Sequence, residues 1–355
     1  MNLLLFAAGL AALVAGAALL VRGASKLALR FGVSPLVVGL TVVALGTSSP
    51  EIAVSVGAAL EGRTDIAVGN VVGSNIFNVL FILGVSALIT PLVVHVQLIR
   101  QEVPVMIGTS LLLLALGLDG RLGRLDAALM FGLLLAYTFF LVVQSRRQGQ
   151  AAADVLTAEV PAESNWDRHW AVQAALIGGG LVLLVAGSDW LVTAAIAFAR
   201  GLGVSELVIG LTIVAAGTSM PEVATSVLAA LKGERDIAVG NVIGSNIFNI
   251  LGCLGLAGLV APAGLPLTPA VLNFDIWVML AVAFACLPVF LTGREIARWE
   301  GGLFLGYYAA YTAYLILASQ QHALLPRFSE AMLTFVLPLT IVTLVVVLVR
   351  GAPPR

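Results

Sequence analysis

The sequence contains little charge. Only 10% of its 355 residues are Asp, Glu, Lys or Arg, whereas 60% are hydrophobic and the mean hydropathy is +1.07. A water-soluble globule of this length needs more polar surface than that. A soluble fold is therefore excluded, and we expect an all-α integral membrane protein of the cell membrane, with the lipid bilayer as its solvent.

Cysteine and histidine are also scarce. The two cysteines, Cys253 and Cys286, lie inside apolar runs, which excludes a disulfide framework and a cysteine metal site. The three histidines fall in loops or at membrane boundaries. No nucleophile–base pair, phosphate-binding loop or metalloprotease helix is present, and a net charge of −1 offers no basic surface for nucleic acid. An enzyme, a cofactor and a nucleic-acid partner are therefore not expected.

Long hydrophobic runs, in contrast, are abundant. Eleven are long enough to cross a hydrocarbon core of roughly 30 Å. They cover residues 3–29, 34–60, 66–88, 103–118, 125–143, 171–197, 205–231, 237–260, 271–291, 301–318 and 331–349. The first run has no basic residue before it and is expected to be a mature helix rather than a signal peptide. Thirteen of the 18 Lys and Arg residues become cytoplasmic if the N-terminus lies outside, which predicts an external N-terminus and a cytoplasmic C-terminus.

A duplicated polar motif interrupts two of these runs. Gly-Thr-Ser-Ser-Pro-Glu at residues 46–51 returns as Gly-Thr-Ser-Met-Pro-Glu at residues 217–222, an offset of 171. Residues 65–78 are nearly identical to residues 236–249 at the same offset. A fixed offset indicates internal duplication. Because each copy holds five spans, the second copy enters the membrane from the opposite side, which predicts two inverted five-helix repeats plus one extra C-terminal helix.

The duplication divides the chain into four segments. The first five-helix repeat is expected at residues 1–143 and the second at residues 170–320. Between them, residues 144–169 form a polar stretch of mixed charge, which we interpret as a cytoplasmic linker. Residues 321–355 contain the extra helix and the C-terminus.

Each motif places a glutamate, Glu51 or Glu222, in the middle of a membrane span. A charge at the centre of a spanning helix costs roughly 2.5–3.5 kcal/mol on insertion scales, so such residues usually mark ion or proton pathways. The preceding prolines remove a backbone donor, and the helices are predicted to open near residues 44–47 and 215–218. Freed carbonyls would then lie beside the hydroxyls of Thr47, Ser48, Thr218 and Ser219. The alternative is a simple proline kink whose polar groups satisfy one another.

The following helix of each copy carries a polar stripe. Three residues spaced four apart share one helix face in each copy: Asn70, Ser74 and Asn78, and then Asn241, Ser245 and Asn249. Glycine pairs four residues apart allow close helix packing, which would bring each stripe against the broken helix. The asparagines either bind an ion or only hold helices together, the second reading being strongest for Asn70, Asn75, Asn241 and Asn246.

Carboxylates, amides, hydroxyls and carbonyls are all hard oxygen donors. Calcium takes six to eight oxygen ligands in flexible geometry, whereas transition metals prefer nitrogen or sulfur. Two glutamates balance the charge of one calcium ion, and the same oxygens can hold sodium.

The pattern Gly-Thr-Ser-x-Pro-Glu followed by Gly-Asn-x-x-Gly-Ser-Asn-Ile-Phe-Asn, twice in one chain, resembles the two alpha repeats of sodium/calcium exchangers in the calcium:cation antiporter superfamily. The resemblance implies ten helices in two inverted halves, to which residues 331–349 add another. It implies calcium binding by Glu51 and Glu222, helped by the carbonyls of Thr47 and Thr218. It also implies further ligands: Ser48, Ser74, Ser219, Ser245, Ala44 and Ala215 for sodium, with Asn78 and Asn249 at the central site.

The resulting hypothesis is a secondary antiporter that exchanges calcium for sodium by alternating access. In the family resembled, an aspartate is often found at one of the positions of Asn78 and Asn249, and two asparagines weaken a potassium-dependent reading. Proton-coupled members carry a Gly-Asn-Ala-Ala-Glu-His type motif, which is absent here, so sodium coupling is favoured. A proton/calcium exchanger and an oxygen-lined cation channel are the alternatives.

Overall fold

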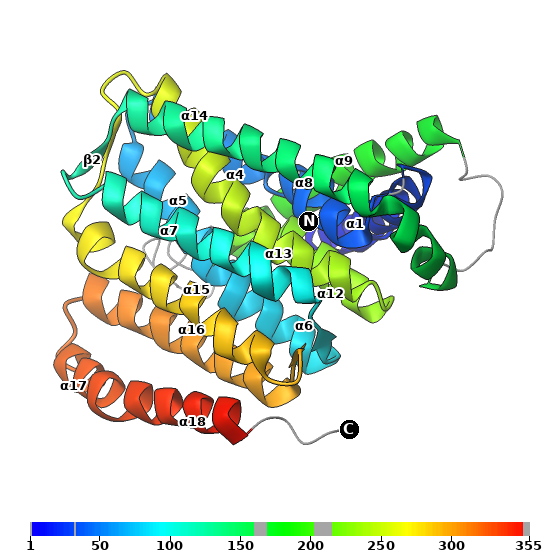
Figure 1. The fold of residues 1–355 in the computed structure, drawn as a ribbon. Helices are drawn as coiled ribbons and strands as arrows, with labels where there is room; N and C mark the ends of the chain where they lie inside the picture. The colour runs from blue at the N-terminus through cyan, green and yellow to red at the C-terminus, as the bar shows by residue number, and fades with distance from the viewer. Residues whose placement is uncertain (1, 32, 160–168, 202–214, 351–355) are drawn as a thin grey trace.

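The chain folds almost entirely into helices (Figure 1). The computed structural model describes residues 2–31, 33–159, 169–201 and 215–350. With π-helical segments labelled η, the first half contains α1 (Asn2–Phe31), α2 (Pro35–Val38), η1 (Gly39–Val43), α3 (Ala44–Thr47), α4 (Ser49–Leu60), α5 (Thr64–Phe77), η2 (Asn78–Leu83), α6 (Gly84–Ile89), β1 (Leu92–Val93), η3 (Leu98–Glu102), α7 (Val103–Leu116), β2 (Arg121–Leu122) and α8 (Arg124–Glu159). The remainder contains α9 (Trp170–Gly201), α11 (Ala215–Gly217), α12 (Met220–Leu231), α13 (Arg235–Phe248), η6 (Asn249–Leu254), α14 (Gly255–Val260), β3 (Leu265–Pro266), η7 (Val271–Asp275), α15 (Ile276–Leu291), β4 (Glu295–Ile296), α16 (Arg298–Ser319), α17 (Leu325–Ala331), η8 (Met332–Val336) and α18 (Leu337–Arg350).

The helices have the length and composition of membrane spans. Within the described ranges, nine are long and apolar enough to cross a bilayer, and the bent pair Pro35–Thr47 and Ser49–Leu60 makes a tenth. The predicted all-α membrane fold is therefore confirmed, and the protein is a multi-pass membrane protein. The remaining predicted span, residues 205–231, begins outside the described residues, and its described part consists of α11 and α12. The predicted linker starts inside a helix, because α8 continues to Glu159.

Two equivalent helices form the centre of the bundle. One is α5 with its continuation through η2 and α6, and the other is α13 with η6 and α14. The most apolar window of the second is 89% buried, whereas that of the span formed by α17, η8 and α18 is not buried at all. In both central helices a π-helical segment starts at the last asparagine of the stripe, Asn78 or Asn249. The duplicated sequence therefore adopts the same irregular local structure twice, and π-helical turns often accompany functional sites.

The close packing predicted from the glycine pairs occurs in the second copy. A Cβ atom added to Gly244 would lie 2.7 Å from the Leu40 carbonyl oxygen, and one added to Gly240 would lie 3.1 Å from that of Leu36. Glycine at these positions therefore lets α13 touch the backbone of the broken helix. The neighbours equivalent to Leu36 and Leu40 in the other copy fall outside the described residues.

Short contacts between loops join the two halves of the chain. Strand β1 pairs antiparallel with β4, and β2 pairs antiparallel with β3. In each pair one strand comes before residues 144–169 and the other comes after them. The halves are therefore joined at two strand pairs rather than folded as separate bodies.

A tyrosine hydroxyl donates to a carboxylate in each half, and this carboxylate is buried at Glu102 and half-buried at Asp275. The Tyr137 hydroxyl donates to Glu102 Oε2 at 2.6 Å, and the Tyr311 hydroxyl donates to Asp275 Oδ1 at 2.9 Å. Each carboxylate is the last residue of a π-helical segment, η3 or η7. These bonds tie α7 to α8 and α15 to α16 on the outside of the central helices.

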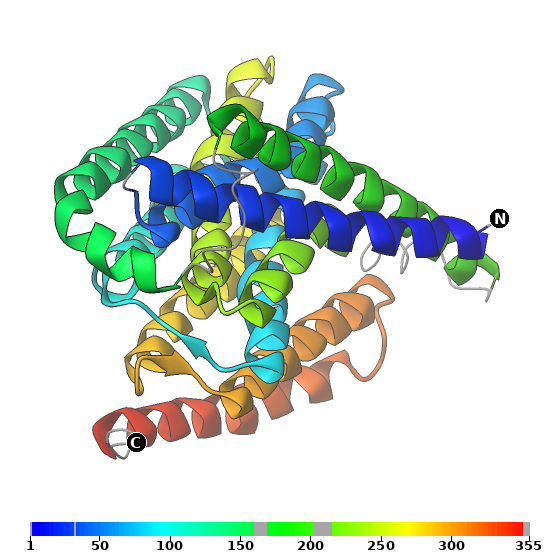
Figure 2. The ribbon, with the colours of Figure 1, turned by 90° about the vertical axis from the view of Figure 1, so that its right-hand side faces the viewer.

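Helices α1 and α9 form a separate antiparallel pair (Figure 2). Gly9 faces Gly187, and Gly16 faces Gly180, so the chain directions are opposed. A Cβ atom added at any of the four would approach a backbone carbonyl to 2.7–2.8 Å. Figure 2 shows the pair lying across one side of the bundle. At the opposite side, α17 and α18 lie along α16 (Figure 1), where the Tyr307 hydroxyl donates to Thr340 Oγ1 at 2.6 Å.

We expect Gly180→Ala to lower the thermal unfolding midpoint of the protein in detergent. The added methyl group would clash with the Gly16 carbonyl oxygen at 2.7 Å, and overpacking of this kind typically costs about 1–3 kcal/mol. Gly179→Ala is the matched control, because Gly179 is exposed, has nothing within 4 Å of its added Cβ and sits on the same helix. Equal shifts for the two variants would contradict the close α1–α9 contact.

Candidate ion-binding site

The two glutamate motifs lie at helix breaks, although the first break is narrower than expected. Residues Ala44–Thr47 are helical, and the Ala44 carbonyl accepts the Ser48 amide at 2.9 Å. The prediction of an open helix at residues 44–47 is therefore wrong. The chain bends by 45° at Ser48 instead, because Pro50 falls within the first turn of α4, where its missing N–H removes no helical bond. In the second copy the break spans residues 218–219, between α11 and α12.

Each glutamate is held by a serine from the other copy. The Ser219 hydroxyl donates to Glu51 Oε1 at 2.8 Å, and the Ser48 hydroxyl donates to Glu222 Oε1 at 3.1 Å. All four residues are 0% exposed. The two carboxylates therefore point into the protein and lie across the interface between the halves.

A second reciprocal set links the threonines to the asparagine stripes. Thr47 donates to Asn241 Oδ1 at 3.1 Å, and Thr218 donates to Asn70 Oδ1 at 3.3 Å. The amide nitrogens of these asparagines donate to serines within their own copies, Ser55 for Asn70 and Ser226 for Asn241. Both threonine hydroxyls are therefore oriented by groups from the opposite copy.

Four asparagines join the central helices where they meet. Asn75 and Asn246 each donate to the other's backbone carbonyl, at 3.2 and 3.4 Å. Their side-chain oxygens accept from the remaining pair: Asn78 donates to Asn246 and Asn249 donates to Asn75. Because the amide nitrogens of Asn78 and Asn249 are used in this way, their side-chain oxygens are left as acceptors.

Several of these buried oxygens have no hydrogen-bond partner among the described residues. They are Glu51 Oε2, Glu222 Oε2, Asn78 Oδ1 and Ser245 Oγ. No basic side chain in the described ranges is paired with either glutamate. Buried carboxylates require a positive partner or hydrogen bonds, and amide and hydroxyl oxygens are ligands for hard cations. The arrangement therefore fits a cation held by two carboxylates and neutral oxygens.

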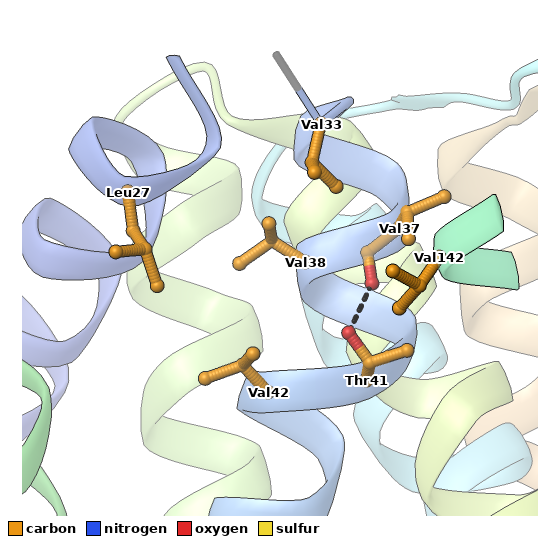
Figure 3. A pocket seen from close by; sticks show the side chains of 7 residues that line it. All are labelled: Leu27, Val33, Val37, Val38, Thr41, Val42 and Val142. Atoms are coloured by element: carbon orange, nitrogen blue, oxygen red, sulfur yellow. Dashed lines mark hydrogen bonds between the residues drawn. The ribbon is translucent and has the colours of Figure 1, made fainter. Parts of the chain in front are cut away.

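The apolar pocket nearest the start of the first broken helix is not this site. A cavity of about 200 Å³ lies between α1, the start of the broken helix and α8 (Figure 3). Its lining residues are Leu27, Val33, Val37, Val38, Thr41, Val42 and Val142. The Thr41 hydroxyl is engaged with the Val37 carbonyl at 2.6 Å. The pocket walls carry no carboxylate and no amide, so they offer a cation little compensation for lost hydration.

Comparison with known proteins identifies the family. The sodium/calcium exchanger protein family matches residues 1–143 and 172–317. The chain belongs to the sodium/calcium exchanger family. It is 41% identical to the putative antiporter CaxA of Alkalimonas amylolytica, over 88% of this chain and 97% of that one. It is 37% identical to the sodium/calcium exchanger MaX1 of Methanosarcina acetivorans, over 88% and 98% of the two chains.

A solved structure supports the same assignment. The structure of the sodium-calcium exchanger NCX_Mj in the absence of sodium and calcium superposes with a TM-score of 0.75 at 31% identity, covering 88% of this chain and 98% of the other. The resemblance inferred from the motifs is thus confirmed, and the family is one of transporters.

The predicted site residues of this exchanger family member mostly come together. Glu51, Glu222, Ser48, Ser219 and Thr47 are fully buried, and Ser74 Oγ lies 3.2 Å from Ser219 Oγ. Thr218 is half-buried. Ala44 is buried beside the break, but its carbonyl already accepts a helical hydrogen bond. The side chain of Ala215 lies outside what the structure describes. Ion ligation by these residues stays a prediction.

Sequence reasoning missed the roles of four polar residues. Ser55 and Ser226, four residues after the two glutamates, anchor Asn70 and Asn241; their equivalence at the offset of 171 could have revealed them. The reading of Asn75 and Asn246 as helix-joining residues is supported by their bonds. That these two also orient Asn78 and Asn249 depends on a crossing of helices that spacing alone does not give.

We expect Glu51→Gln/Glu222→Gln to stabilise the exchanger in cation-free buffer. At about pH 8, above the ordinary carboxyl range, the folded protein must either bury these carboxylates as charges with no positive partner among the described residues or keep them protonated, and both cost free energy that two amides avoid. The midpoint of thermal unfolding in detergent should rise by about 4 °C or more, given roughly 2–4 °C per kcal/mol in a large domain. Glu61→Gln, at an exposed loop carboxylate, is the control and should change nothing. A lower midpoint for the double variant would contradict an uncompensated charge pair.

Proposed function

We propose that this exchanger family member is a secondary antiporter that moves calcium in exchange for sodium. The carrying observation is the pair of buried glutamates, Glu51 and Glu222, each held by one hydroxyl and each left with one unpaired oxygen. One divalent ion neutralises both charges. The names of two similar proteins support calcium and sodium as the transported ions, since MaX1 and NCX_Mj are both described as sodium/calcium exchangers.

The neutral oxygens around the glutamates suit competition between two cations. Calcium would take the two carboxylates with the Thr47 and Thr218 carbonyls. Sodium, with half the charge, relies more on neutral oxygens; we assign to it Ser48, Ser74, Ser219, Ser245 and the carbonyls of Ala44 and Ala215, with Asn78 and Asn249 at the shared centre. Because both ions need the same carboxylates, binding of one displaces the other, which is the requirement for coupled exchange.

Alternating access would follow from the duplication. Equivalent residues of the two copies make reciprocal hydrogen bonds across the site. The first helices of the copies, α1 and α9, run antiparallel. This supports two inverted repeats, residues 1–143 and 170–320, joined by a cytoplasmic linker at residues 144–169. We place the N-terminus outside and the C-terminus in the cytoplasm by the distribution of Lys and Arg. Ion binding would then shift the population between states open to either face.

The residues at the centre favour sodium over potassium coupling. Both central positions, Asn78 and Asn249, are uncharged amides, so the described site offers no third carboxylate for an additional cation. Sodium is preferred to protons because the Gly-Asn-Ala-Ala-Glu-His type motif of proton-coupled members is absent from the sequence; proton coupling here would have to use Glu51 and Glu222 themselves.

Radiolabelled calcium uptake into proteoliposomes tests this function. An outward sodium gradient should drive uptake, whereas potassium and proton gradients of the same size should not. Glu51→Gln should reduce the sodium-driven rate by roughly 100-fold or more, because the bound cation loses one of its two carboxylate partners and breaking a buried ion pair costs about 3–5 kcal/mol. Glu222→Gln should do the same.

Glu61→Gln serves as the matched control, since it removes an exposed carboxylate and should transport at the wild-type rate. Uptake that follows the proton gradient and ignores sodium would instead establish a proton/calcium exchanger. Calcium flux that needs no counter-ion would indicate a channel.

A further inference from the structure

The two broken helices are covered unequally. Helix α1 packs along α12, but in the described ranges α9 makes no comparable contact with the equivalent helix α4. The difference is visible three residues beyond each glutamate, roughly 4.5 Å further along the helix axis. Thr225 on α12 is 0% exposed, whereas its equivalent Val54 on α4 is 38% exposed. The side of the site next to α12 is therefore closed, because α1 covers this helix.

The closed half contains two buried hydroxyl groups without partners. Thr225 Oγ1 and, on α6, Ser86 Oγ have no hydrogen-bond partner among the described residues, although Ser86 is only 1% exposed. Helix α6 packs against α12, and both end at the same side of the bundle (Figure 1). Ser86 lies one turn before the end of α6.

The equivalent positions in the other copy carry no hydroxyl. They are Val54 for Thr225 and Ala257 for Ser86, at the common offset of 171. An unpaired buried hydroxyl destabilises a fold, and an apolar residue at the same place does not. The two hydroxyls therefore occur in one copy only, and their burial without a partner among the described residues calls for a role other than packing.

We propose that Thr225 and Ser86 line the ion path between the Glu51–Glu222 site and the membrane face at which α6 and α12 end. The proposal rests on the exchange function proposed above. When α1 moves away from α12, a cation leaving the glutamates enters a narrow half-path and loses part of its water shell. Hydroxyl oxygens replace that water. In the other copy the equivalent positions, Val54 and Ala257, are 38% and 0% exposed and offer the ion no side-chain oxygen, so we assign no path of this kind to the α4 side.

The test compares Thr225→Val with the reciprocal swap Val54→Thr. Two quantities are measured: the initial rate of sodium-driven calcium uptake in proteoliposomes, and equilibrium binding of radiolabelled calcium in detergent. Thr225→Val should slow uptake about tenfold, because the moving ion loses one interaction of about the strength of a hydrogen bond. Calcium affinity should change by less than about twofold. Thr225→Ser should restore the rate, and Val54→Thr should leave both quantities unchanged.

Uptake by Thr225→Val at the wild-type rate would overturn the proposal, and so would a parallel loss of equilibrium binding, which would place Thr225 in the site itself. Should Thr225→Val fail to fold, Ser86→Ala tests the same path at its mouth and should slow uptake about threefold. Wild-type protein that shows no sodium-driven uptake would refute the exchange function and this path together. Wild-type exchange with unaffected variants would refute the path alone.

Discussion

Two carboxylates buried in the interior of a membrane protein, without a basic partner in the described part of the chain, are the constraint on which this structure depends. Glu51 and Glu222 are fully buried, and each retains an unpaired oxygen. Hydration cannot offset their charge there, and under the proposed function a bound cation does. The surrounding hydroxyls and amides lower the cost of ionisation without neutralising it, which is what the proposed exchange of one cation for another requires.

Neither copy of the repeat can build this site alone. Each glutamate is held by the serine of the other copy, each motif threonine donates to the other copy's asparagine, and the central asparagines bond across the same interface. Assembly of the two halves and formation of the site are therefore one event. The strand pairs between the halves and the tyrosine–carboxylate hydrogen bonds at the periphery hold the outer helices around this shared centre.

The near-equivalence of the halves makes their differences informative. The central helices are nearly identical over residues 65–78 and 236–249 and bond symmetrically, whereas α1 covers α12 and leaves α4 more exposed. The glycines of α1 and α9 face each other and let the two helices pack closely as one body. The proposed alternating access would move this body relative to the centre.

The sequence by itself determined the membrane class, the duplication and most helix limits, and it predicted which residues to assign to the site, because hydropathy and a repeat at a fixed offset are one-dimensional properties. It misplaced the opening of the first broken helix: proline excludes a hydrogen bond but does not say whether the chain unwinds over a turn or bends at Ser48. Only the tertiary structure decided that Ser219 serves Glu51, that Asn246 orients Asn78, and that Thr225 is buried where Val54 is exposed. Those facts depend on which helix faces cross, and spacing along one chain carries no information about the partner on the other side of a contact.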